Sequence, residues 1–247
     1  MEMMVRDSEP RFVFIHGAGG THRVWRYQTS AFPSSIALDL PGHPIGKGYS
    51  TISEYARFVT QVIEERELGQ TILVGHSMGG AIAIEIALAH PKFLMGIVLI
   101  GSGARLRVAP IIKDEVKRDY VHAAEVIAEW AYSPKSDAKL RKGAIQELLG
   151  VPAVVTYGDF QACDNFDRMN EIDGIDLPTM VVCGEDDLLT PIKYSQYLEE
   201  KIRNALSVVI PDAGHSVMLE KPGELNNALR SFREKLYRHS EFSDRIP

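Results

Sequence analysis

Short apolar runs recur along the chain, and each is bounded by glycine, proline or aspartate. They are four to five residues long, rich in β-branched side chains and apolar at consecutive positions. This is typical of strands that are buried on both faces of a parallel sheet. Six runs fit: Arg11 to Ile15, Ser35 to Leu38, Thr71 to Val74, Ile97 to Ile100, Thr179 to Cys183 and Ser207 to Ile210. We therefore expect about six strands in a mainly parallel sheet.

Between these runs, apolar residues follow the helical spacing of three and four. Residues 53–67 are predicted to form a helix with one buried face, and a second such helix is predicted to begin at Pro222 and Gly223. Alternating strands and helices predict an α/β fold. From about Ser102 to Asp176 the alternation stops, and this interval is predicted to hold several helices. We expect a core of residues 1–101 and 177–247, with a helical cap, or lid, inserted at 102–176.

Length and composition are consistent with one such domain. The chain has 247 residues, of which 45% are hydrophobic, which suffices for one well-buried core. Its formal charge is −6, and the chain contains no run of five or more Lys and Arg, so a nucleic-acid partner is not expected. No apolar stretch reaches the roughly 18 residues that cross a membrane.

Cysteine usage and the N-terminus bear on location. Cys163 and Cys183 are the two cysteines, and they lack the spacing of a zinc site or a disulfide framework. Residues Met1 to Pro10 have no apolar core of secretory length. A cytoplasmic protein without membrane attachment, present as a monomer or a homodimer, is therefore expected.

The strongest chemical signal is the turn Gly75-His76-Ser77-Met78-Gly79. It lies between a predicted buried strand and a predicted helix, where a G-x-S-x-G turn exposes the serine hydroxyl above the sheet. Glycines two positions either side are needed because the turn leaves no room for a Cβ. The alternative, a glycine turn with an idle serine, explains the spacing less well. Ser77 is therefore predicted to be a nucleophile.

A serine nucleophile needs a base and a carboxylate to orient that base. Of the eight histidines, His215 lies in a loop just after the last predicted strand, where parallel sheets carry their chemistry. His43, in a Pro-Gly-His-Pro loop, has no such role in our interpretation. The acid is expected after the preceding strand, where Glu185, Asp186 and Asp187 are consecutive. Physical reasoning alone does not choose among the three.

Nucleotide and metal chemistry are not expected. Gly17-Ala-Gly19 and Gly101-Ser-Gly103 follow predicted strands, but neither completes a dinucleotide fingerprint. Gly42 to Lys47 is one residue short of a phosphate-binding loop. No cofactor and no metal site are therefore predicted.

Taken together, these motifs resemble those of the α/β-hydrolase superfamily, in particular its small capped serine carboxylesterases, over nearly the whole length of the chain. The matching residues are His16-Gly17, Asp39-Leu40-Pro41-Gly42-His43, the turn at Ser77, Gly184 to Pro191, Gly214-His215 and Glu220-Lys221-Pro222. Members often begin with an antiparallel hairpin, and its absence before Arg11 agrees with six strands. His43-Pro44 departs from the common pattern, in which glycine follows the histidine.

The resemblance implies the missing assignments. It makes Asp187 the acid, although Asp186 remains an alternative. The oxyanion hole is implied to be the amides of Met78 and Ala18. Gly17, Gly19 and His76 are expected to contact substrate. In the cap, Tyr120 and Trp130 are expected to form part of an apolar ceiling over the acyl group. The alternative is that these cap residues only pack the cap helices together.

The expected function is hydrolysis of carboxylic esters with small to medium acyl chains, through an acyl-enzyme intermediate and with a small-molecule ester as substrate. The same triad also serves lactonases, C–C bond hydrolases and a lyase of the menaquinone pathway, so these remain alternatives. The lyase would need cavity arginines, for which Arg105 and Arg107 are the candidates. A ligand receptor with negligible turnover is a further alternative.

Overall fold

A six-stranded sheet, all of whose strand pairs are parallel, forms the centre of the protein in the computed structural model, which describes residues 9–243. The strands are β1 (Arg11–Ile15), β2 (Ile36–Leu38), β3 (Thr71–His76), β4 (Leu94–Ile100), β5 (Thr179–Gly184) and β6 (Ala205–Ile210). They lie in the order β2-β1-β3-β4-β5-β6. The prediction of six strands in a parallel sheet is confirmed. The expected lack of an N-terminal hairpin concerns residues that lie largely outside the described ones.

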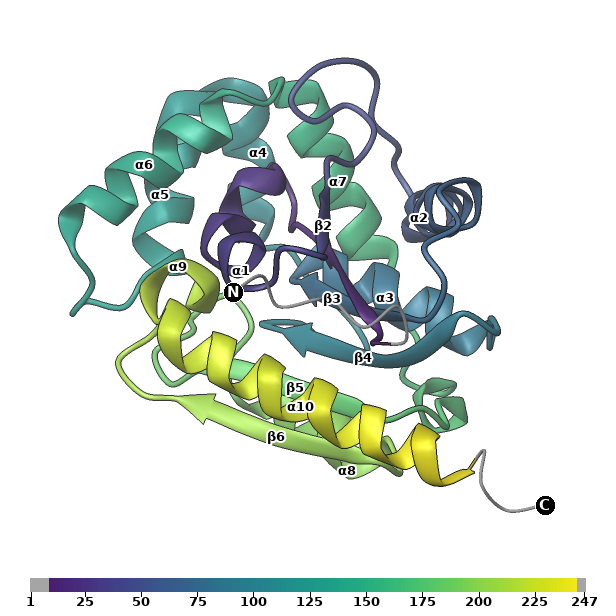
Figure 1. Cartoon of the computed structure of the whole chain (residues 1–247). Helices are drawn as coiled ribbons and strands as arrows, with labels where there is room; N and C mark the ends of the chain where they lie inside the picture. Colours follow the sequence, from purple (N-terminus) through teal and green to yellow (C-terminus); the bar gives the residue numbers. More distant parts are fainter. Residues whose placement is uncertain (1–8, 244–247) are drawn as a thin grey trace.

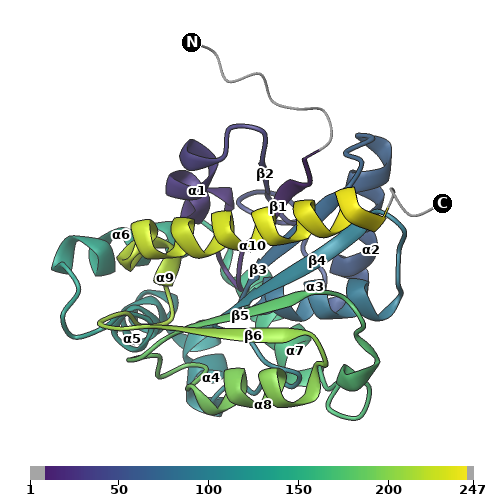
Figure 2. The ribbon, with the colours of Figure 1, turned by 60° about the horizontal axis from the view of Figure 1, so that its bottom comes forward.

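Helices cover both faces of this sheet because alternate strand residues point to opposite sides. Val13, Ile15 and Leu73 pack into one apolar cluster with residues of α2 (Ile52–Glu65), α3 (Met78–Leu88) and α8 (Lys193–Lys201). Phe12 and Phe14 pack into a second cluster, against the opposite face. This cluster includes residues of α10 (Pro222–Ser243), which follows α9 (Val217–Glu220) and lies across the sheet beside α1 (Arg26–Ala31) (Figure 2).

The elements agree with the sequence pattern to within a few residues. The helix predicted at 53–67 is Ile52–Glu65, and it begins where the Thr51 hydroxyl accepts from the Glu54 amide. The run predicted to start at Ile97 begins three residues earlier, at Leu94. A short 3₁₀ helix, His22–Trp25, which the pattern did not show, precedes α1.

Four helices separate β4 from β5 where the alternation was expected to stop. They are α4 (Pro110–Arg118), α5 (Tyr120–Ala131), α6 (Ala138–Leu149) and α7 (Ala153–Asn165), followed by a 3₁₀ turn, Ile172–Gly174. We call these four helices and their loops the cap. They gather at one end of the molecule, beyond the carboxyl ends of the strands (Figure 1). Whether the cap is a separate unit with boundaries at 102 and 176 stays a prediction.

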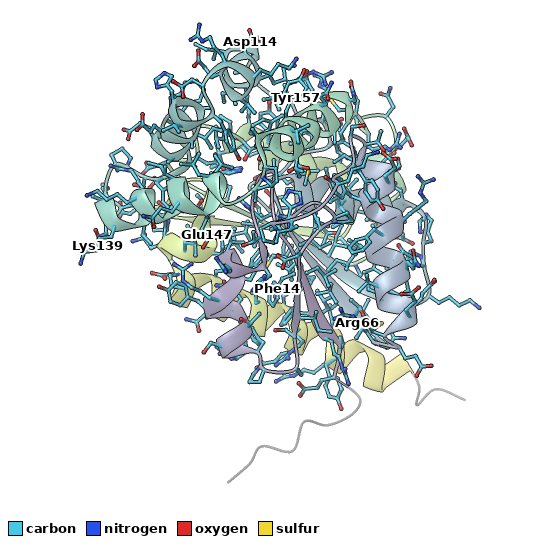
Figure 3. The ribbon with its side chains drawn as sticks, turned by 90° about the horizontal axis from the view of Figure 1, so that it is seen from above. Phe14, Arg66, Asp114, Lys139, Glu147 and Tyr157 are labelled. Carbon is cyan, nitrogen blue, oxygen red and sulfur yellow. The ribbon has the colours of Figure 1, made fainter. Side chains whose placement is uncertain are left out.

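Asp114 and Tyr157, on cap helices, lie at one end of the molecule, and Arg66, just after the end of α2, lies at the other (Figure 3). Phe14, in the sheet, lies between these two ends. The loops that follow the strands therefore lie between the sheet and the cap. Among residues 9–243, none of the helices is long and apolar enough to cross a membrane.

Candidate active site

Ser77 stands between β3 and α3 on a strained turn. Its backbone angles are φ 52° and ψ −114°, a region that a residue with a side chain rarely adopts. Its amide donates to Ile100 O (2.9 Å), and its carbonyl accepts from the Ser102 hydroxyl (2.9 Å) and the Gly80 amide (2.9 Å). These bonds hold the turn, and the Ser77 side chain faces two cavities.

The loops after β5 and β6 bring Asp187 and His215 together. His215 Nδ1 lies 2.8 Å from Asp187 Oδ2, and both side chains are almost completely buried. The other carboxylate oxygen, Oδ1, accepts from the amides of Leu189 and Thr190, each at 2.9 Å. Burial alone would raise the pKa of Asp187, but the charge of His215 and the hydrogen bonds from His215 and Thr190 outweigh it and lower that pKa. Asp187 is thus held as a carboxylate.

Asp186, the alternative acid, points elsewhere. Its Oδ2 accepts from the hydroxyl of Ser133, which follows α5 in the cap, at 2.6 Å. Among the bonds of the described residues, none joins Asp186 to His215. Of the two aspartates, therefore, the structure pairs Asp187 with the histidine.

Ala18 and its glycine neighbours lie against the Ser77 turn. A Cβ placed on Gly17 would be 3.0 Å from His76 Nδ1 and 3.1 Å from Ser77 Cβ, so this backbone approaches the turn closely. Within the described residues, neither the Ala18 amide nor the Met78 amide has a backbone or side-chain acceptor. Two free amide donors beside a reactive serine are what an oxyanion hole requires.

His76 is a neighbour of the histidine rather than a competitor for its role. Its Nε2 donates to the His215 carbonyl oxygen at 3.1 Å, and the centroids of the two rings lie 4.6 Å apart with the rings tilted by 56°. Burial and the nearby His215 lower the pKa of His76 well below its ordinary value. A neutral His76 therefore holds the His215 loop through the hydrogen bond to the His215 carbonyl.

Two cavities meet at Ser77. The larger, of about 1080 Å³, lies between the Ala18 loop, α1 and the cap helices α5 and α6. The smaller, of about 160 Å³, lies under α4 and α5 and is mostly apolar. Its lining includes Leu106, Ile112, Trp130, Phe160, Cys163 and Leu188. Ala18, Ser77 and His215 line both cavities, so a substrate bound at the serine could extend into each.

The residues expected to contact substrate are distributed unevenly. Gly17, Gly19 and His76 line the larger cavity, and Trp130 lines the smaller. Tyr120 was predicted to join them, but it lines neither of these two cavities. Its hydroxyl is 2.6 Å from Leu148 O and 2.8 Å from Thr156 Oγ1, inside the cap. The hydroxyl of Tyr120 is therefore satisfied within the cap, and contact of Tyr120 with substrate stays a prediction.

The sequence interpretation missed three residues near the site. Thr190 donates its hydroxyl to Asp187 Oδ2 at 2.8 Å, and His43 forms a buried ion pair with Asp159 of α7. The available signals were weak: a hydroxyl three residues after the acid, and a charged residue within an otherwise apolar stretch of helix. No group of three or more His, Cys, Asp or Glu among the described residues is arranged to hold a metal ion.

A parallel sheet with a serine on a strained strand–helix turn and a His–Asp pair beyond its carboxyl ends defines a class of enzymes, the α/β hydrolases. A family model described as the alpha/beta hydrolase family matches residues 12–228. The chain belongs to this family and is an enzyme of this class.

Similar proteins include ester hydrolases. The pimeloyl-acyl-carrier-protein methyl ester esterase of Nitrosomonas europaea is 24% identical, over 86% of this chain and 91% of its own length. A solved thermophilic esterase is 33% identical, with a TM-score of 0.83 over 93% of this chain and 91% of its own. The structure of Est816, described as an N-acyl homoserine lactone degrading enzyme, is 28% identical, with a TM-score of 0.78 over 90% and 93%. These relatives support ester hydrolysis in general.

Proposed function

We propose that the protein hydrolyses carboxylic esters with small to medium acyl groups, through an acyl-enzyme formed on Ser77. The observation that carries the proposal is the buried Asp187–His215 pair, whose His215 lines the same two cavities as Ser77. Because Nδ1 of His215 faces Asp187, its Nε2 is the nitrogen left to accept a proton.

In the proposed reaction, Ser77 Oγ attacks the ester carbonyl carbon while His215 Nε2 takes the hydroxyl proton. The negative charge that develops on the carbonyl oxygen is stabilised by the amides of Ala18 and Met78. The alcohol leaves with the proton from His215, and the acyl group stays on Ser77. Water then attacks the acyl-enzyme by the same route, and the acid is released.

The two cavities support a division of the substrate. The smaller cavity, of about 160 Å³, is close in size to a cavity of about 150 Å³ that accommodates a benzene ring. An acyl group of up to about six carbons is therefore its expected occupant. The larger cavity, beside Ala18 and α6, would take the alcohol portion. Lys139 lies at the outer edge of this region and points outward (Figure 3).

The candidate arginines of the lyase alternative do not form a cluster of free cations in the cavities. Arg105 and Arg107 lie 3.5 Å and 3.8 Å from the same carboxylate oxygen of Asp167, and both side chains are about half exposed. Arg107 also donates to Asp164 O. Arg105 lines neither cavity, and Arg107 lines only the smaller one, where its guanidinium is engaged by Asp167 and by the Asp164 carbonyl.

The test is a series of p-nitrophenyl esters from acetate to decanoate. We expect turnover to be highest for acetate to hexanoate, to fall for the decanoate, and to be lost in Ser77→Ala. A fluorophosphonate should label the wild type and leave Ser77→Ala unlabelled. A wild-type protein that shows neither turnover nor labelling would exclude the enzyme proposal and favour a ligand receptor. A preference for decanoate would exclude the assignment of the acyl group to the smaller cavity.

A further inference from the structure

Asp159 of α7 is a carboxylate without solvent contact, far from the Asp187–His215 pair in sequence. Its side chain is 0% exposed, and three donors surround it. Oδ2 accepts from the Gly19 amide (2.9 Å) and His43 Nε2 (2.8 Å), and Oδ1 accepts from the Tyr55 hydroxyl (2.6 Å). One cap side chain thus joins the loops after β1 and β2 and the helix α2.

His43 faces acceptors with both ring nitrogens. Nε2 lies against Asp159, and Nδ1 lies 3.1 Å from Pro41 O and 3.3 Å from Leu40 O. Each nitrogen must then carry a hydrogen, which makes His43 an imidazolium. Burial lowers its pKa, but the hydrogen bond and charge of Asp159 outweigh this and raise it above the ordinary value. The pair is therefore a buried salt bridge.

A buried salt bridge is not explained by stability alone. Taking two charges out of water costs several kcal/mol, and apolar residues of similar volume often serve stability as well or better. A geometric role explains the Asp159–His43 pair better, namely that it holds the segments it joins in one fixed arrangement. The nearest part of the site is the loop containing Ala18, one residue before Gly19.

Both peptide groups that flank Ala18 are held by side chains. The peptide before Ala18 is held by its oxygen, because Gly17 O accepts from His16 Nδ1 (2.8 Å) and the Gly20 amide (3.1 Å). His16 can donate there because its Nε2 accepts from the Leu40 amide (3.1 Å), which sets the tautomer. In a trans peptide the N–H points opposite to the C=O, so the Ala18 N–H is directed away from His16.

The peptide after Ala18 is held by its nitrogen, which is the Gly19 amide that donates to Asp159. Gly19 has φ +62°, and a Cβ there would be 2.2 Å from a Leu148 methyl carbon of the cap. The loop therefore has little freedom once Asp159 is in place. His16 and Asp159 together determine the direction of the one amide between them.

We propose that Asp159, with its partner His43, is a positioning residue for the oxyanion hole: it ties the cap to the Ala18 loop so that the Ala18 amide faces the reacting carbonyl oxygen. This inference rests on the proposed ester hydrolysis. It makes the cap part of the catalytic apparatus through α7, in addition to any role in enclosing the substrate.

The test compares Asp159→Asn with Asp164→Asn. Both residues are on α7, and Asp164 pairs with Lys113 of α4 without contacting the Ala18 loop. For p-nitrophenyl butyrate we expect Asp159→Asn to lower kcat roughly 10- to 100-fold with KM changed less than about 3-fold, because a misdirected donor acts on the transition state. A trifluoromethyl ketone, whose bound hemiketal carries the oxyanion, should lose affinity by a similar factor. Asp164→Asn should retain wild-type kcat and ketone affinity.

His43→Gln provides a second variant, which keeps a donor near Asp159 but removes the cation. His43→Gln should also lower kcat, by a smaller factor than Asp159→Asn. It provides the test if Asp159→Asn does not fold. Unchanged kcat in either folded variant, or an equal loss in Asp164→Asn, would overturn the proposal. A loss of kcat with full ketone affinity would also overturn it. Absence of turnover and labelling in the wild type would instead overturn the ester-hydrolase proposal itself.

Discussion

Two adjacent aspartates in the loop after β5 differ completely in their surroundings. Asp187 receives hydrogen bonds on both oxygens and pairs with His215, whereas Asp186 binds the hydroxyl of Ser133 in the cap. Consecutive residues in a turn point in different directions, so one position decides which carboxylate can orient the histidine. At the residue scale, the proposed role of Asp187 therefore rests on the direction of its side chain and not only on its being an acid.

We therefore expect Asp187→Asn to lower kcat by about 10³-fold or more, because an amide in this place would no longer stabilise the protonated histidine. Asp186→Asn is the matched control, and it should change kcat less than about 3-fold. Steady-state kinetics on p-nitrophenyl butyrate measure both. Similar losses in the two variants would contradict the assignment of Asp187.

At the scale of elements, the β3–Ser77–α3 turn is a tightly packed junction. A Cβ on Gly75 would lie 2.1 Å from Gly79 O, and one on Gly79 would lie 2.3 Å from Ile15 O of β1. These contacts are with backbone, which cannot move aside as a flexible side chain could. The glycines thus allow α3 to begin directly over the strand ends, with Ser77 at its head.

Gly75→Ala is expected to reduce thermal stability strongly, by 10 °C or more in order of magnitude, or to prevent folding, since a shift of the whole turn would be needed. Gly223→Ala near the start of α10 is the control, because a Cβ there meets no atom within 4 Å. Its melting temperature should stay close to that of the wild type. A Gly75→Ala protein as stable as Gly223→Ala would show that the turn can relax.

At the scale of the whole molecule, the core contains histidines in opposite charge states. Burial, followed by the positive charge of His43, lowers the pKa of His16 to about 4. The pKa of His76 is lowered in the same direction. The pKa of His43 is raised, so its contribution to stability is fully present below about pH 6.5 and is lost as pH rises through its folded value.

His16 binds its proton in the unfolded chain at about pH 6.5 and in the folded protein only near pH 4. Its contribution is therefore complete above pH 6.5 and is lost as pH falls to 4, by about 3 kcal/mol at most. We expect the urea midpoint to be lower at pH 4.5 than at pH 7. In His16→Gln the difference between the two midpoints should be smaller. Equal midpoints at both pH values in the wild type would contradict this.

Much of the architecture was predictable because its signals are local. Strand runs such as Thr71 to Val74 and the helix near residues 53–67 follow from hydrophobic periodicity, which neighbouring residues alone express. The glycines around Ser77 are also a local signal, because they mark positions where the turn leaves no room for a Cβ. By contrast, His43 and Asp159 are 116 positions apart, and no short-range pattern relates them.

The sequence by itself determined the parallel α/β fold, the position of the serine turn and the loops in which a histidine and an acid would be found, because each depends on local backbone geometry and on the burial of strands. Only the tertiary structure showed the hydrogen bond that pairs Asp187 with His215, the hydrogen bonds of Tyr120 inside the cap, and the contact of Asp159 with the Ala18 loop. Those outcomes depend on the directions in which side chains from distant loops point once the sheet and the cap have packed together.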